Sequence, residues 1–331
     1  MVKKILISGI CGFLGAHVCE HIMKETDWDI IGIDRLSYAS SGFDRIRDIE
    51  AYNHKKVKLL PVDLTKRISE GVLDEVGDVD YILHLAASTH VQNSIENPEP
   101  FVFDNVIGTF YILELAKQIK GLKKFIYFGT DEEMGDAPIG VEYKEDDPVN
   151  PRNPYAATKQ GGASLCNAYH ITYGLPIIRT RCMNIYGERQ HPEKYVPLCI
   201  KKIINDDKIS VHVNPKTQQP GSRFWIHARN VASALMFLLD NGKNGEIYHI
   251  APPDELDNLE IAQKIADIIG KPLNYELVDW HSKRPGHDSR YALNGDKLKK
   301  LGWKMPVSFE ESFKKTVKWS IREENKKWLG L

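Results

Sequence analysis

The chain has 331 residues, 42% of them hydrophobic and 27% charged, which is enough apolar sequence for a full core in two lobes. Its 44 basic and 45 acidic side chains almost cancel, which argues against nucleic acid or an anionic membrane surface as a partner. The five cysteines are scattered and never spaced C-x-x-C, so we expect reduced thiols in a cytoplasmic protein with neither a disulfide framework nor a metal site.

The apolar runs of the chain are short, too short for a signal peptide or a membrane-spanning helix. In the first half they alternate with segments of helical spacing such as Phe101–Ile119. Repeated βα units of this kind form a parallel sheet covered on both faces. We therefore predict a doubly wound α/β sheet, a Rossmann domain over residues 1–180. Its expected strands are Lys4–Ser8, Ile30–Ile33, Val57–Leu60, Tyr81–Leu85, Phe125–Phe128 and Ile177–Thr180.

The alternating pattern breaks after about residue 181, where clusters of glycine, proline and polar residues separate shorter elements. We expect a smaller C-terminal α/β lobe over residues 181–331 that binds the substrate. Part of residues 228–252, including the run Gly245–Ile250, is a candidate to return to the first sheet.

Gly9, Gly12 and Gly15 follow the first predicted strand and open a helix. Small residues there let the backbone approach a pyrophosphate, and the helix N-terminus attracts its charge. Asp34 ends the second predicted strand nineteen residues after Gly15, where a carboxylate accepts hydrogen bonds from an adenosine ribose. That charge favours NAD over NADP; the neighbouring Arg35 has the opposite preference and is given less weight. The alternative is that the glycines only make a tight turn.

Tyr155 and Lys159 stand one turn apart on a helix that begins with Asn153 as its N-cap and Pro154 at its first position. A neighbouring ammonium favours the phenolate of a tyrosine, which can then take a hydroxyl proton while hydride leaves the same carbon. The spacing alone is common on exposed helices. Together with the glycine pattern it indicates an alcohol-oxidising site.

Thr130, Asp131 and Glu132 follow the run Phe125–Phe128, at the carboxyl edge of the predicted sheet, where active sites gather. One interpretation of this motif is an ordinary solvated turn without a catalytic role. The other is a catalytic acid and base pair for the elimination of water. Crowding with a third carboxylate, Glu133, raises one pKa and leaves one group protonated while another is ionised.

With these motifs the chain resembles the extended short-chain dehydrogenases/reductases, and within them the nucleotide-sugar 4,6-dehydratases of the dTDP-glucose 4,6-dehydratase group. The resemblance runs nearly end to end. Besides the motifs above it rests on Leu36–Ala39, Ala86–Ala87, His90–Val91, Ser94, Asn105–Thr109, Arg181–Gly187, Pro192–Lys194, Arg223–His227 and Arg284–Asp288.

The resemblance implies a mechanism on matching residues. Tyr155 deprotonates the hydroxyl on sugar carbon 4, Thr130 hydrogen-bonds it, and hydride passes to NAD. Glu132 then removes the carbon 5 proton while Asp131 protonates the departing carbon 6 hydroxyl, and the hydride returns to carbon 6. The transient ketone does the activation, so no metal is needed.

The resemblance also implies which residues bind. Cofactor contacts fall on Gly9, Gly12, Phe13, Leu14, Gly15, Asp34, Asp63, Leu64, Ala86, Ala87, Tyr155 and Lys159. Contacts with a nucleotide-diphosphate hexose fall on His90, Asn184, Glu193, Lys194, Arg223, Arg284 and His287. The family commonly forms homodimers through the segments that match Phe101–Ile119 and Tyr155–Tyr173.

Two departures from the family pattern stand beside the reactive motif. Glu133-Met134 replaces the usual Val-Tyr, and Gly129 precedes Thr130 where serine is frequent. If Glu133 is buried, its charge must be neutralised or paired. The nucleotide base and the hexose stay open, with dTDP-glucose and UDP-glucose as the leading substrates.

Two other functions compete with dehydration. A nucleotide-sugar 4-epimerase or 4-oxidase of the same superfamily needs no acid for carbon 6, so the Asp131–Glu132 pair argues against it. A non-catalytic NAD-binding sensor does not require a hydroxyl relay, so Thr130, Tyr155 and Lys159 argue against that.

Overall fold

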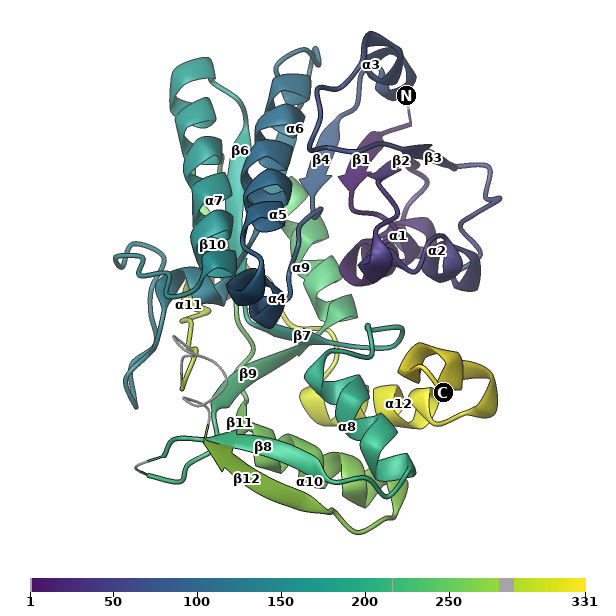
Figure 1. Ribbon diagram of the computed structural model, residues 1–331. Coiled ribbons are helices and arrows are strands. Elements are labelled where there is room, and N and C mark those ends of the chain that lie inside the picture. The colour runs from purple at the N-terminus through teal and green to yellow at the C-terminus, as the bar shows by residue number, and fades with distance from the viewer. Residues whose placement is uncertain (1, 216, 280–288) are drawn as a thin grey trace.

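The computed structural model describes residues 2–215, 217–279 and 289–331, and over these residues the strands form three sheets (Figure 1). The strands are β1 (Lys4–Ser8), β2 (Asp29–Asp34), β3 (Val57–Pro61), β4 (Tyr81–His84), β5 (Lys124–Thr130), β6 (Ile177–Cys182), β7 (Asn184–Tyr186), β8 (Ile209–Val213), β9 (Ser222–His227), β10 (Ile247–Ile250), β11 (Glu255–Asp257) and β12 (Tyr275–Asp279). The α-helices are α1 (Phe13–Glu25), α2 (Asp44–Asp48), α3 (Glu70–Val76), α4 (Val91–Glu96), α5 (Glu99–Val102), α6 (Gly108–Ala116), α7 (Pro154–Tyr173), α8 (Tyr195–Ile204), α9 (Ala228–Asn241), α10 (Asn258–Ile269), α11 (Asp296–Leu301) and α12 (Phe309–Ser320).

The largest sheet has seven parallel strands in the order β10-β6-β5-β4-β1-β2-β3. This is the doubly wound arrangement that the alternating runs predict, so the predicted fold class is confirmed. All seven strands point the same way, and their carboxyl ends therefore share one edge. The segments after β1, β4 and β5, which carry the predicted functional motifs, meet at that edge.

Side chains alternate between the two faces of the sheet, as the period of two in a strand requires. Ile5 and Ile7 of β1 are buried in one cluster with helices α1 and α9, whereas Leu6 between them is buried in another with α6 and α7. Helices thus cover both faces, and the strands read as continuous apolar runs for that reason.

The chain leaves the first sheet after β6 and later returns to it. Residues Ile247–Ile250 pair with β6 in parallel, and α9 packs against α1, so part of the segment 228–252 joins the Rossmann sheet. Helix α11 also packs on the first sheet, against β10. The remaining strands and α-helices of the second half surround a separate core. They are the three-stranded sheet β11-β9-β7, the pair β12-β8, and helices α8, α10 and α12.

The predicted helix Phe101–Ile119 is not one regular helix. It consists of α5, a π-helical segment Phe103–Ile107 and α6, which ends at Ala116. Inside the π-helical segment, Asn105 donates from Nδ2 to Ser88 O and to Thr158 Oγ1 of α7. Such wide turns are frequent at functional sites, and here one lies beside the helix that carries Tyr155.

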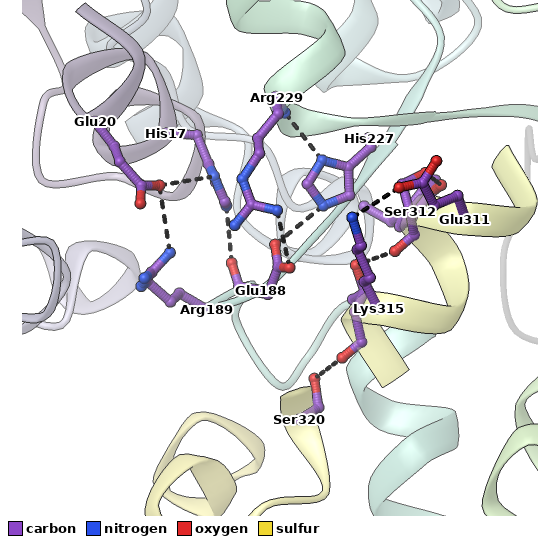
Figure 2. A network of polar contacts seen from close by, with 12 residues as sticks. His17, Glu20, Glu188, Arg189, His227, Arg229, Glu311, Ser312, Lys315 and Ser320 are labelled. Atoms are coloured by element: carbon purple, nitrogen blue, oxygen red, sulfur yellow. Dashed lines mark hydrogen bonds and ion pairs between the residues drawn. The ribbon is translucent and has the colours of Figure 1, made fainter. Parts of the chain in front are cut away.

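A buried polar network connects the two halves of the chain (Figure 2). The Glu188 carboxylate, in the loop after β7, contacts His227 Nε2 at 3.0 Å and Arg229 Nη1 at 3.1 Å. Its backbone oxygen lies 2.9 Å from His17 Nε2 of α1. The network therefore fixes the loop after β7 against the first helix of the Rossmann sheet.

Across the parts of the chain that the structure describes, no helix combines the length and the apolar character that crossing a membrane requires.

Candidate active site

A cavity of about 620 Å³ opens at the carboxyl edge of the seven-stranded sheet and extends into the second half of the chain. Every predicted site residue that the structure describes lines it. These are Gly9, Gly12, Phe13, Leu14, Gly15, Asp34, Asp63, Leu64, Ala86, Ala87, His90, Thr130, Asp131, Glu132, Tyr155, Lys159, Asn184, Glu193, Lys194 and Arg223. The other two, Arg284 and His287, lie outside the described residues.

The glycine loop is a cradle that side chains would fill. A Cβ on Gly15 would lie 2.1 Å from Gly9 O, and one on Gly9 would lie 2.8 Å from the Ala86 backbone. Gly9 also has a φ of 75°, which favours glycine. Gly12 is the N-cap of α1 and caps it with no side chain, so the first N–H groups of the helix face the cavity edge. These features fit a dinucleotide pyrophosphate.

The Asp34 carboxylate lies at the end of β2 and is held by two backbone donors. Leu36 N–H donates to its Oδ1 at 2.8 Å and Cys11 N–H to its Oδ2 at 3.0 Å. Arg35, which would favour a 2′-phosphate, points its guanidinium at Asp104 and donates to that carboxylate through Nη2 at 2.6 Å. Because Arg35 is paired, the carboxylate of Asp34 decides the preference, and the site suits a ribose hydroxyl.

Helix α7 begins as the sequence predicts. Asn153 Oδ1 accepts from Ala156 N–H at 2.8 Å, and Pro154 occupies the first helical position. The Tyr155 N–H donates to Ser94 Oγ of α4, which fixes the start of the helix against the neighbouring segment. Lys159 Nζ donates to Phe128 O at 2.7 Å, so the end of β5 and the helix are tied at the reactive centre.

Burial is the largest cause of the pKa shifts of Tyr155 and Lys159 on this helix. It raises the pKa of Tyr155 above the ordinary value, and the charge of Glu132 adds to that rise. Burial lowers the pKa of Lys159 to about 8. The expected depression of the Tyr155 pKa by Lys159 is therefore outweighed in the protein alone, although the side chain of Thr130 shares a hydrogen bond with Tyr155 that acts in the lowering direction.

Thr130 ends β5, and the chain then makes a short 3₁₀ turn over Asp131–Met134. Thr130 Oγ1 accepts from Glu132 N–H and donates to Asp131 Oδ1 at 2.9 Å. The Glu133 side chain accepts in return from Thr130 N–H at 3.2 Å, which completes a capping box. The interpretation of this motif as a solvated turn is wrong, since Asp131 and Glu133 are buried.

Asp131 and Glu132 differ in their contacts. Glu132 Oε2 accepts from Asn153 Nδ2 at 2.8 Å and from Tyr291 OH at 3.3 Å. Asp131 Oδ2 is buried and has no hydrogen-bond partner among the described residues. Burial, and next the charge of Glu132, raise the pKa of Asp131 to about 7. One carboxyl is thus suited to hold a proton near neutral pH while its neighbour is held by donors.

Glu133, which stands where the family usually has valine, has a partner for its charge. It is buried and paired: Arg181 Nε of β6 donates to its Oε2 at 3.0 Å, and both side chains are at most 5% exposed. The condition that a buried Glu133 must be paired is therefore met.

Two cations from the second half of the chain line the cavity, Arg223, which is buried, and Lys194, which is partly exposed. The Arg223 guanidinium stacks over the Tyr291 ring at 4.5 Å and donates to Ser289 O at 3.2 Å. Lys194 Nζ donates to Thr89 O at 3.1 Å, so it bridges the second half of the chain to the loop after β4. Both line the same cavity as the glycine cradle.

Sequence reasoning missed two donors to Glu132. Asn153 was expected only as an N-cap, and its Nδ2 also holds the carboxylate. Tyr291 was not expected at all; it lies 159 residues from Glu132 in the chain, and no local pattern singles it out. The nearby predicted motif Arg284–Asp288 is the one signal that this region of the chain approaches the site.

Comparisons with known proteins agree with this geometry. The sequence model of the GDP-mannose 4,6 dehydratase family matches residues 6–316. The chain belongs to this family. It is 34% identical over 350 residues to the dTDP-glucose 4,6-dehydratase of Salmonella typhimurium, covering 99% of this chain and 94% of that protein. It is 35% identical over 320 residues to a low-salt glycan biosynthesis protein of Haloferax volcanii, covering 97% of this chain and 99% of that one.

Solved structures give the same picture. A dTDP-glucose 4,6-dehydratase from Streptomyces venezuelae with NAD bound superposes with a TM-score of 0.88 at 32% identity, covering 98% of both chains. A UDP-glucose 4-epimerase from Thermus thermophilus in complex with NAD gives a TM-score of 0.84 at 26% identity, covering 96% of this chain and 98% of that one. Dehydratases and epimerases of the superfamily thus share this fold, and the residues of the site must separate them.

Proposed function

We propose that this protein is a nucleotide-sugar 4,6-dehydratase that converts an NDP-hexose, dTDP- or UDP-glucose first, to the 4-keto-6-deoxy sugar. The observation that carries the proposal is the Asp131–Glu132 pair, with Asp131 buried and Glu132 partly buried, in one cavity with Tyr155 and the glycine cradle. Epimerisation at carbon 4 has no use for a buried acid with a free oxygen. Loss of the carbon 6 hydroxyl requires one.

NAD is the cofactor, and when bound it supplies a hydride acceptor for carbon 4 and a hydride donor for carbon 6. Gly9, Gly12 and Gly15 would hold its pyrophosphate, and Asp34 would accept from its adenosine ribose. Asp63 and Leu64 line the same cavity and would border the adenine, and Ala86 and Ala87, which follow β4, line it too. Because the hydride returns to the same sugar, this loop serves retention of the cofactor rather than exchange.

Tyr155 and Lys159 carry out the first proton transfer. Tyr155 takes the proton of the carbon 4 hydroxyl, and Thr130 hydrogen-bonds the same oxygen. Burial raises the pKa of Tyr155 in the protein alone, so its ionisation depends on positive charge in the assembled site, to which the Lys159 ammonium contributes. Lys159 reaches from α7 to the end of β5, where its Nζ donates to Phe128 O. It would also hydrogen-bond the nicotinamide ribose of the bound cofactor.

Asp131 and Glu132 carry out the elimination. Ketone formation at carbon 4 acidifies carbon 5, whose proton Glu132 removes; Asn153 and Tyr291 orient that carboxylate. Asp131 holds a proton near neutral pH and donates it from Oδ2 to the leaving hydroxyl of carbon 6. A C–O and a C–H bond break, water leaves, and an unsaturated ketone remains for reduction at carbon 6.

The substrate lies across the second half of the chain. Arg223 and Lys194 meet the diphosphate, since both are cations that line the cavity, Arg223 buried and Lys194 partly exposed. His90, Asn184 and Glu193 add hydrogen bonds to the sugar nucleotide, and we assign Arg284 and His287 to the same substrate from their motif.

Assembly and location extend the proposal. We propose a homodimer formed through the segments Phe101–Ile119 and Tyr155–Tyr173, whose exposed side chains include Val102, Phe103, Ile171 and Tyr173. We propose a cytoplasmic enzyme because all five cysteines are buried and unpaired. We divide the chain into a cofactor domain, residues 1–180 joined by part of 228–252, and a nucleotide-sugar lobe, residues 181–331.

Incubation of the purified protein with a panel of nucleotide hexoses, followed by mass spectrometry, tests the function. Loss of one water with no net change in NAD is the expected result. An unchanged mass with inverted carbon 4 would replace dehydratase by epimerase. No reaction with any hexose, together with retained NAD, would favour a sensor.

A further inference from the structure

Glu133 is a charged residue at the centre of the site that the proposed reaction does not use. It is 1% exposed and lies beneath the reactive turn rather than in the cavity wall. Its two carboxylate oxygens have separate tasks: Oε1 accepts from Thr130 N–H at 3.2 Å, and Oε2 accepts from Arg181 Nε at 3.0 Å. An ionised carboxylate is costly to bury, so its presence beside the reaction requires a reason.

Neighbouring residues are fitted to this carboxylate. A Cβ on Gly129 would lie 2.6 Å from Glu133 Oε1 and 2.3 Å from Thr180 O, so the glycine leaves the space that the carboxylate fills. Arg181 is anchored in turn, since its Nη1 donates to Glu145 O at 3.2 Å. The two departures at positions 129 and 133 are therefore one structural unit with Arg181.

We propose that Glu133, anchored by Arg181, is a positioning residue that fixes the backbone of Thr130 and supplies a negative potential at Tyr155 and Lys159. The inference rests on the proposed function, because it takes Thr130, Tyr155 and Lys159 to be the residues that oxidise carbon 4. It adds a role for a residue that lies outside the reacting atoms.

The charge of Glu133 acts on the groups that surround it. It opposes the effect of burial on Lys159 and keeps the pKa of that ammonium from falling further. It also adds to the rise in the pKa of Tyr155, after burial and the charges of the reactive turn. The titratable and charged groups that interact with it are Tyr127 on β5, Tyr155, Lys159 and Cys166 on α7, and Arg179 and Arg181 on β6. Asp131 and Glu132 precede it on its own turn.

The charge of Glu133 raises the pKa of both Tyr155 and Lys159, so its removal should change the pH dependence of the rate in a recognisable way. Without the negative charge, Tyr155 ionises at lower pH, which moves the acid limb of the rate profile toward acid. Lys159 loses its proton at lower pH, which moves the alkaline limb in the same direction. Disruption of packing alone would lower the rate at every pH and leave both limbs in place.

The first test is Glu133→Gln, which keeps an oxygen for Thr130 N–H and removes the charge. We expect both limbs of the kcat profile to move about one pH unit toward acid, so that the rate on the alkaline limb falls about tenfold, with KM little changed. Glu188→Gln is the matched control: it removes an equally buried, ion-paired carboxylate outside the cavity lining, and its limbs should not move. Limbs of Glu133→Gln that stay in place would overturn the proposal.

A second readout does not depend on turnover. NMR titration of the protein with ¹³C-labelled lysines, with the Lys159 signal assigned from its loss in Lys159→Arg, reports the pKa of this amine in the whole protein. We expect that pKa to be about one unit lower in Glu133→Gln than in the wild type. An unchanged Lys159 would refute the charge-setting role even if no nucleotide hexose reacts, whereas lack of turnover by the wild type would refute the proposed function alone.

The double variant Glu133→Gln/Arg181→Gln guards against misfolding of the single variant, which leaves Arg181 buried without its anion. It should regain stability against urea relative to Glu133→Gln while keeping the shifted limbs. A double variant with wild-type limbs would mean that the single variant acted through the unpaired Arg181 and not through the lost charge.

Discussion

The two ends of the cavity are built in different ways. The cofactor end requires residues without side chains, because a single added carbon on Gly9 or Gly15 would collide with the backbone. The reactive end depends on buried charge, with Asp131, Glu133 and Lys159 all nearly inaccessible to solvent. The cofactor end cannot accommodate added side-chain volume. The reactive end can accommodate substitutions of equal volume, but the pKa values of its residues change when a charge is removed. Substitutions at the two ends should therefore fail differently, by loss of NAD in one case and by altered rate or pH dependence in the other.

The largest effect is expected at the cofactor end, with Gly15→Ala. Its new methyl group would lie 2.1 Å from Gly9 O, so the loop must move away from the pyrophosphate. We expect no retained NAD, no detectable activity and a loss of about 1–3 kcal/mol in the free energy of unfolding. Release of NAD from denatured protein, measured by absorbance, checks this. Gly71→Ala is the control, because a Cβ there meets nothing within 4 Å; equal cofactor content in both variants would contradict the cradle.

At the reactive end, Tyr155→Phe removes the hydroxyl and keeps the ring. We expect kcat to fall by about 10³-fold while NAD is still retained, because general base catalysis contributes on that scale. Steady-state assays with the nucleotide hexose that the panel identifies measure it. Tyr173→Phe, an exposed tyrosine on the same helix, should leave kcat unchanged. A Tyr155→Phe enzyme within tenfold of wild type would assign the base to another group.

Asp131→Asn combined with Glu132→Gln separates oxidation from elimination. We expect absorbance of reduced cofactor to appear on addition of substrate while dehydrated product falls at least about 100-fold. The amides keep the volumes and most donor contacts, so the cradle should hold NAD as before. A double variant that still eliminates water at the wild-type rate would remove both residues from the acid and base roles.

The smallest effect is on stability. Burial raises the pKa of Asp131 from 3.8 to about 7, so between these values the folded protein binds more protons than the unfolded chain and loses stability as pH rises. Asp131→Asn should therefore raise the free energy of unfolding by about 1–3 kcal/mol at pH 8 and leave it unchanged near pH 4. Urea unfolding at both pH values measures this, with the exposed Asp240→Asn as control. A gain that is equal at both pH values would mean that burial of the charge is not its cause.

The difference between the two ends also decides what the sequence can predict. The glycine loop, Asp34 and the helix start at Asn153 depend on residues close together in the chain, so spacing alone predicts them and their place in the sheet. The donor from Tyr291 to Glu132 joins residues 159 apart, and the pair of Arg181 with Glu133 joins residues 48 apart. Tyr291 is marked by no local pattern, and the motif Arg181–Gly187 does not indicate that Arg181 pairs with Glu133. The pKa of Asp131 depends on burial that only the assembled fold creates.

The π-helical segment at Phe103–Ile107 is a second feature that local sequence does not predict. Its apolar spacing is helical, and the sequence predicts the helix. The wide turn arises where Asn105 reaches Ser88 and Thr158, contacts that the tertiary structure sets.

The central claim is that hydrogen removed from carbon 4 returns to carbon 6 of the same sugar, with Tyr155, Asp131 and Glu132 handling the protons. The most direct measurement uses the nucleotide hexose carrying deuterium at carbon 4 and locates the label in the product by NMR. We expect deuterium in the carbon 6 methyl group of a 4-keto product. Deuterium retained on carbon 4, with that centre inverted and the mass unchanged, would contradict it.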